Sequence, residues 1–235
     1  MKKIIVIILV LIIIAGAITG FNFYKANKEK QAFYNMVYNT VYNENGDIKS
    51  YTFKGTSTQA GNIIQSMELY YDGVNMKTLE NYKSGEDGYT EYKEIVTDKE
   101  ITYSLTNGDD TWFKQIYATD EYGISDRLSG QVPDMAIILE AKTVKQVEEN
   151  VYQIEYDKKY LEEMSSEDET VESVVGKVYI ESDYVVKVEL ETISSNLEIK
   201  RISTKLVFEL SDINSTVVGI PDDIKKSAEE VVYEE

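Results

Sequence analysis

Between Ile48 and Tyr117, apolar side chains recur at every second position, in short runs that turn-forming residues separate. A period of two is typical of strands with one buried face, whereas helices repeat their apolar residues every three or four positions. Asp72-Gly73 is the strongest turn signal, because this dipeptide suits a two-residue hairpin. Strands joined this closely predict an antiparallel meander, so this region limits the chain to a β-rich fold.

The last third of the chain returns to the same period with longer strands. In residues 184–193, three aliphatic side chains are predicted to face inward and three charged ones outward: Val186, Val188 and Leu190 against Lys187, Glu189 and Glu191. Such strands suit an antiparallel sheet that is wet on one face. Further strands are predicted at 143–147, 151–156, 174–180 and 197–210, with an exposed acidic loop at 165–172.

Four segments have helical signals instead. Residues 25–43 repeat apolar side chains at the spacing of an amphipathic helix, and Pro133 suits the first turn of a helix over 133–141. Asp157 is expected to cap a helix over 158–164, and a last helix is expected to begin at Pro221. The prediction is an α+β protein: one strongly curved antiparallel sheet with helices packed on its concave face.

An apolar run at the N-terminus, Ile4–Ile18, follows two lysines. The 21 residues from Ile4 to Tyr24 carry no charge, which is long enough to span a bilayer. Two interpretations remain open: a signal peptide cleaved near Ala17, or an uncleaved transmembrane anchor that holds the domain outside the cytoplasm. The expected organisation is a signal or anchor helix at 1–24, a stalk at 25–33 and one domain at 34–235.

Composition excludes several classes of function. The chain has 42 acidic and 24 basic residues, a net charge of −18, so nucleic acid is not an expected partner. It has no cysteine and no histidine, which removes disulfides, thiolate or Ser-His-Asp catalysis and the usual zinc sites. Acidic turns at Glu86-Asp87 and Asp109-Asp110 lack the spacing of a calcium loop. We therefore expect a protein that is not an enzyme and needs no cofactor or metal.

The order of signals in the chain resembles a known family. After the N-terminal helix come the phrases IKSYTFKG, EENVYQIEYDKKYLEEM, GKVYIESDYVVKVELE, KRISTKLVFELSDIN and GIPDDIKKSA. From about Tyr34 to Ala228 this layout is similar to the LolA-like and LppX/LprG-like superfamily of extracytoplasmic proteins, in the form of a Gram-positive, clostridial-type member. The resemblance implies a half-barrel closed by helices over an apolar cavity. Because the lipobox cysteine is missing, it also implies attachment through the apolar run.

The resemblance suggests two functions. In the first, the protein holds a lipid or acylated ligand, such as a lipoprotein, in the half-barrel. Flexible methionines and large aromatic side chains suit an adaptable apolar pocket, although the same residues also suit an ordinary filled core. The candidate lining residues are Met67, Tyr71, Met76, Trp112 and Phe208. In the second, the fold is filled and docks a cell-envelope enzyme or complex, as in relatives that act in spore germination.

Overall fold

The computed structural model describes residues 28–82, 88–96, 99–118, 130–166, 169–196 and 201–231. The apolar run Ile4–Ile18, residues 25–27 of the stalk and the acidic turn at Glu86-Asp87 lie outside these ranges. Within them, no helix is both long and apolar enough to cross a membrane. The chain divides into two compact units, Met1–Met36 and Val37–Glu235, and the second contains the whole sheet. Residues 28–42 are helical.

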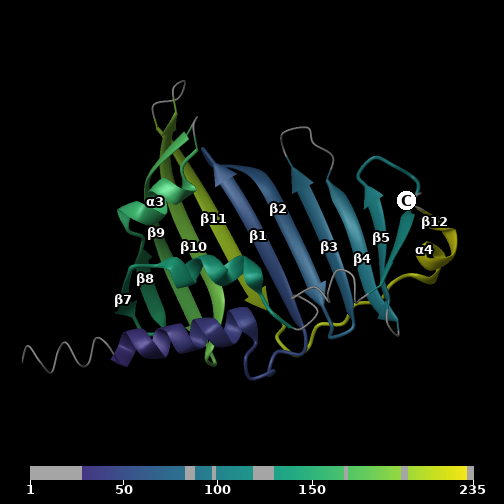
Figure 1. Cartoon of the computed structure of the whole chain (residues 1–235), viewed down its shortest axis with the longest axis horizontal. Coiled ribbons are helices and arrows are strands. Elements are labelled where there is room, and N and C mark those ends of the chain that lie inside the picture. The colour runs from purple at the N-terminus through teal and green to yellow at the C-terminus, as the bar shows by residue number, and fades with distance from the viewer. Residues whose placement is uncertain are drawn as a thin grey trace, which may run out of the picture. The chain divides into compact units, whose positions relative to one another are not determined.

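The second unit is organised by a twelve-stranded sheet that is open at both ends and not closed into a barrel (Figure 1). Neighbouring strands are antiparallel except β12 and β6, which are parallel. The order is β12-β6-β5-β4-β3-β2-β1-β11-β10-β9-β8-β7. The strands are β1 Tyr51–Gln59, β2 Asn62–Tyr71, β3 Asn75–Tyr82, β4 Tyr89–Val96, β5 Lys99–Thr106, β6 Phe113–Ala118, β7 Thr143–Glu148, β8 Val151–Glu155, β9 Glu169–Glu181, β10 Tyr184–Asn196, β11 Ile202–Ser211 and β12 Glu229–Glu230.

The register defines an inner face on the sheet. A row of paired residues from β2 to β8 points to this face: Met67, Gly55, Phe208, Val188, Val178 and Tyr152. The aliphatic members of β9 and β10 in this row have no exposed surface. The outer face of the same strands carries ion pairs instead, such as Lys187 with Glu209 at 3.2 Å. The predicted division into an apolar and a charged face is therefore confirmed here.

A 3-10 helix, η2 (Pro133–Glu140), covers the inner face from β1 to β8 (Figure 1). The Tyr51 hydroxyl of β1 donates to the Gln131 carbonyl at 2.8 Å, and the Tyr156 hydroxyl after β8 donates to the Ile137 carbonyl at 3.0 Å. η2 buries Met135 and Ile138 completely. A second helix, α3 (Lys158–Met164), begins at Asp157, whose carboxylate accepts from the Tyr160 N–H at 3.0 Å, as predicted.

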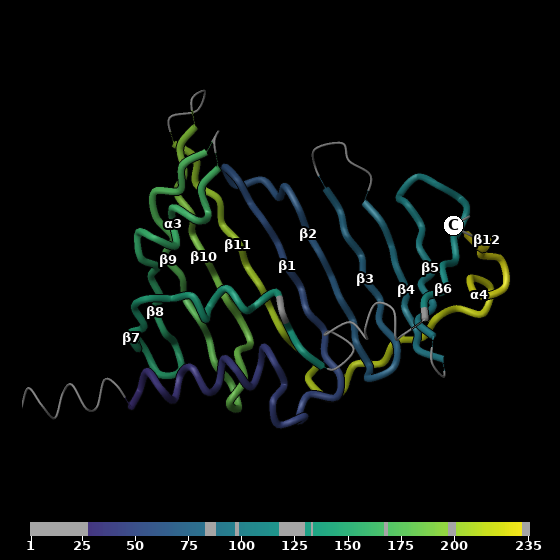
Figure 2. The backbone as a smooth tube through the Cα atoms, in the orientation of Figure 1, coloured from purple at the N-terminus to yellow at the C-terminus, as the bar shows by residue number. Residues whose placement is uncertain are grey.

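The last segment, residues 212–231, covers the opposite face of the other half of the sheet. We call it the C-terminal strap. It contains α4 (Asp222–Ser227) and buries Val218 and Ile224 against Tyr92 and Tyr103, which lie on the outer face of β4 and β5. Figure 2 traces the strap from the end of β11 past the strand ends to β12. The two halves of the sheet are therefore covered on opposite faces.

Several predicted details are wrong, each for a local reason. A β-bulge between Val185 and Lys187 turns Val185, not Val186, inward, and Val185 has no exposed surface.

The turn after β2 lies one residue later than the predicted Asp72-Gly73, because the Asp72 N–H donates to the Asn75 carbonyl at 3.1 Å and closes the turn around Gly73 and Val74. Part of the predicted acidic loop belongs to β9, which begins at Glu169 because β10 extends far enough to pair with it. The helix at Pro133 is a 3-10 helix.

Candidate binding surface

The apolar inner face extends beyond its helical cover. Met67 of β2 and Leu206 and Phe208 of β11 are only partly buried, whereas Val188 and Leu190 beside them are closed off from solvent. We call these three partly buried residues the apolar strip. Period-two alternation places them on one face, since Gly55 pairs with both Met67 and Phe208. The strip is thus the part of the inner face that a ligand can still reach.

Gly55 shapes the middle of the strip. A Cβ atom at this position would lie 3.5 Å from the ring of Phe208 and 3.5 Å from that of Phe53. The two rings are stacked, with centroids 5.7 Å apart and an interplanar angle of 26°. The contacts that a Cβ atom would make are of ordinary van der Waals length, so both rings pack closely over Gly55.

The structure brings four of the five predicted lining residues to the inner face. Met67 and Phe208 belong to the apolar strip, while Tyr71 and Met76 pair with each other nearby and are buried, at 3% exposed each. Burial, and then the neighbouring charge of Asp72, raises the pKa of Tyr71. Trp112 lies apart from the other four, in the outer-face cluster under the strap, with its ring 5.7 Å from that of Tyr92. A lining role for the five residues remains a prediction.

Sequence reasoning missed Leu206 as a lining residue, although the alternation in β11 places it beside Phe208. The same alternation carries the inner face on to Ile202. The period-two alternation of β11 therefore predicts the face on which Leu206 lies, although Leu206 is neither aromatic nor a methionine. Gly55 gave no sequence signal of its own, because its role depends on the two strands that pair with β1.

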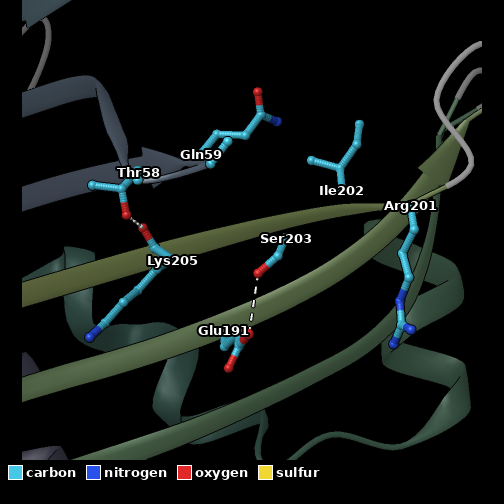
Figure 3. Close-up of a pocket in the computed structure, with 9 residues that line it drawn as sticks. Thr58, Gln59, Glu191, Arg201, Ile202, Ser203 and Lys205 are labelled. Atoms are coloured by element: carbon cyan, nitrogen blue, oxygen red, sulfur yellow. Dashed lines mark hydrogen bonds between the residues drawn. The ribbon is translucent and has the colours of Figure 1, made fainter.

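A hollow of about 630 Å³ adjoins the far end of the strip, where β1 ends and β11 begins (Figure 3). Ile202 and Gln59 lie on one side of β11, and Ser203, Lys205 and Glu191 lie on the other (Figure 3). The Ser203 hydroxyl donates to the Glu191 carboxylate at 3.2 Å. The polar lining residues of this hollow, Glu191, Ser203 and Lys205, belong to the outer face of the sheet, opposite the apolar strip. None of the five predicted lining residues borders the hollow.

A tyrosine and glutamate cluster occupies the inner face of β2 to β4. Glu80, 9% exposed, accepts from Gln65 Nε2 at 2.9 Å and from the Tyr82 hydroxyl. Burial raises the pKa of Tyr89, and the hydrogen bond to Glu80 raises it further. The phenol groups around Glu80 form a polar network on this part of the inner face.

No group of three or more acidic, cysteine or histidine side chains within the described ranges is arranged to hold a metal ion. Asp109 and Asp110 lie exposed in the turn before β6. The comparisons with known proteins give no match, either to a protein-family model or to a curated protein. The function must therefore be argued from the surface of this chain.

Proposed function

We propose that this protein is a membrane-anchored, extracytoplasmic binding protein that holds the acyl chain of a lipid or acylated ligand along the apolar strip. The observation that carries the proposal is that Met67, Leu206 and Phe208 continue a buried apolar face yet stay partly open. The open sheet would act as a half-barrel of the LolA-like type. The run Ile4–Ile18, retained as an anchor, would keep the domain close to the bilayer that supplies the ligand.

The energetics suit a reversible carrier. Each methylene group that an acyl chain buries contributes about 0.8 kcal/mol. Association and ordering of a flexible chain cost several kcal/mol in return. Because the strip is only three residues long, we expect an affinity that is high enough to take up one acyl chain and low enough to release it.

Mass spectrometry of an organic extract from the purified full-length chain tests the proposal. We expect a co-purifying acyl compound, and we expect the chain freed of lipid to bind a fluorescent fatty acid. Phe208→Asp places a charge on the strip and should weaken binding at least tenfold. Val207→Asp is the matched control, because the next residue of β11 points to the outer face, and it should bind as the native chain does.

An extract without acyl compounds, together with no binding of the fluorescent probe, would exclude the proposal. Equal binding by the Phe208→Asp and Val207→Asp variants would show that the probe binds elsewhere.

A second function is supported by the tight packing beneath η2. Ile154, Val178 and Val188 have no exposed surface at all, so even a water-sized space does not reach them. A closed core in this region favours the function of an interaction protein, in which the acidic domain docks a cell-envelope enzyme or complex.

Crosslinking in cells distinguishes docking from acyl-chain binding. Repeated recovery of one envelope protein supports docking, and a set of crosslinked proteins that varies between repeats argues against it.

A further inference from the structure

We infer that a second hollow, on the outer face of the sheet, binds a carbohydrate chain. It measures about 870 Å³ and lies between the β9–β10 turn and the turn that follows β11. We call it the outer hollow. The site does not depend on the proposed acyl binding, because the apolar strip is on the other face of the sheet.

The walls of the outer hollow are fixed turns. The β9–β10 turn has positive φ angles at Ser182 (50°) and Asp183 (69°), and the turn after β11 has them at Asp212 (52°) and Asn214 (63°). Residues other than glycine adopt such angles uncommonly, and do so where surrounding contacts hold them. Asn214 provides these contacts: its side chain accepts from the Lys49 N–H at 2.6 Å and donates to the Asp47 carbonyl at 2.9 Å. The hollow is therefore preformed.

The floor is apolar and aromatic in the middle of a charged face. The β-bulge in β10 directs Val186 outward into the hollow, beside Ile213. β-Bulges often serve to re-aim a side chain in this way. Tyr179 and Tyr184 complete the floor, and the Lys187 ammonium lies 5.8 Å from the centroid of the Tyr179 ring. Both tyrosine rings are partly exposed, and because Lys187 lies over one face of the Tyr179 ring, a ligand would pack on the ring surface that remains.

The rim carries both signs of charge. Lys54 and Lys187 provide donors, and Glu181, Glu209 and Asp212 provide acceptors. A phosphate or carboxylate ligand would face three carboxylates, and a cation would face two ammonium groups. The hydroxyl groups of a sugar both donate and accept hydrogen bonds, so they can use the whole rim.

A sugar ring also has an apolar C–H face that packs on a tyrosine ring, as apolar surfaces do on aromatic side chains. The volume of the hollow lies in the range of small-molecule sites. A neutral oligosaccharide fits this combination of flat aromatic floor and mixed polar rim better than a charged ligand does. Because the hollow is wide and open, we expect weak binding at each site and stronger retention on a polymeric glycan.

Saturation-transfer difference NMR tests this inference on the full-length chain in detergent micelles, with empty micelles as the blank. The probes are chitotetraose, which carries N-acetyl groups, and maltotetraose, which does not. We expect saturation transfer to the C–H protons of at least one of them. Tyr179→Ala should weaken binding about tenfold, and Tyr179→Phe, which keeps the ring, should bind nearly as well as the native chain.

Tyr38→Ala is the matched control, because Tyr38 is a tyrosine 41% exposed on the helix at residues 28–42, outside the outer hollow. It should leave binding unchanged. Val186→Glu provides a second variant that charges the floor, and it should also abolish saturation transfer. Circular dichroism confirms that each variant is folded. An absence of transfer to both oligosaccharides, or equal binding by the Tyr179→Ala and Tyr38→Ala variants, would overturn the inference.

Discussion

Gly176 lies at a crowded point of the inner face, between β8 and β10. A Cβ atom there would come within 2.5 Å of Leu190 Cδ2 and 2.7 Å of Ile154 Cγ1, both on buried side chains. The close fit means that the two aliphatic side chains occupy the space above the glycine. At this point the inner face is filled by neighbours across the strands, in contrast to the partly open strip at Phe208.

We expect Gly176→Ala to lower the free energy of unfolding by about 1–3 kcal/mol, the usual cost of overpacking a closed core. Gly219→Ala is the matched control, since nothing lies within 4 Å of a Cβ atom at that position, and it should change stability by less than about 0.5 kcal/mol. Urea unfolding followed by circular dichroism measures both. Equal stability of the two variants would contradict the packing described here.

Asp72 holds together two distant parts of the chain. Its carboxylate accepts from the backbone N–H groups of Asn75 at 2.7 Å, Val74 at 3.1 Å and Val218 at 3.0 Å. Burial opposes ionisation of Asp72, but the bonds from Asn75, Val218 and Val74 outweigh it and hold the pKa of the carboxyl below its ordinary value. Asp72 therefore ties the β2–β3 turn to the strap more strongly when it is ionised.

The stability that Asp72 contributes should depend on pH. Because its folded pKa lies below the unfolded value of about 3.9, the contribution is complete above that value and disappears as pH falls through the folded pKa. We expect Asp72→Asn to be less stable than the native chain by about 1–3 kcal/mol at pH 7. The difference should shrink below about pH 4. A difference that stays constant from pH 7 to pH 3 would rule out this role.

At the scale of elements, the C-terminal strap depends on a charge pair beneath α4. The Lys225 ammonium binds the Glu94 carboxylate, which also accepts from the Tyr103 hydroxyl at 3.0 Å. Burial raises the pKa of Tyr103 to about 12, and the hydrogen bond to Glu94 adds to the effect. Since Glu94 is 8% exposed, its charge needs Lys225. The strap also supplies β12, whose Glu229 N–H donates to the Trp112 carbonyl at 2.8 Å.

Lys225→Met should therefore lower the free energy of unfolding by about 1–3 kcal/mol, because it leaves a buried carboxylate without its cation. Lys226→Met is the control: it removes the same charge from the next, exposed position of α4 and should be nearly neutral. Chemical unfolding compares the two variants. A Lys226→Met variant as unstable as Lys225→Met would indicate that net charge, rather than the pair with Glu94, stabilises the strap.

At the scale of the whole sheet in Val37–Glu235, the two halves rest on different covers. η2 lies on the inner face between β1 and β8, and the strap lies on the outer face of β4 and β5. The inner face of β3 to β5 carries polar residues such as Thr78, Lys93 and Thr102, and this half of the sheet is covered from the outer face by the strap. Each cover therefore stabilises its own half.

We expect a chain that ends at Thr216 to lose hydrogen-exchange protection mainly in β3 to β6. The truncation keeps the turn at Asn214 but removes Val218, Ile224 and Lys225, so Tyr92 and Tyr103 become exposed. Protection in β1 and β8 to β11 should persist, because η2 is intact. Mass spectrometry of hydrogen–deuterium exchange, region by region, measures this. Equal loss of protection in both halves would show that the sheet unfolds as one unit.

Much of this architecture is predictable from local patterns. The alternation in residues 184–193 places β10, and Asp157 defines the start of α3, because both signals act over a few neighbouring residues. The bulge at Val186 was not predictable. It lets both Val185 and Val188 face a core that only the paired strands define. That Trp112 packs in the outer-face cluster, apart from the other four candidate residues, was not predictable either, because the cluster is formed with the distant strap.

The sequence alone determined the antiparallel meander, the positions of most strands and turns, and the absence of thiol and imidazole side chains. Each follows from composition or from contacts between neighbours in the chain. Only the tertiary structure decided which face of each strand is covered, because η2 and the strap reach strands far away in sequence. It also decided that Phe208 stays partly open and that Val186 faces the outer hollow, since both depend on pairing across strands.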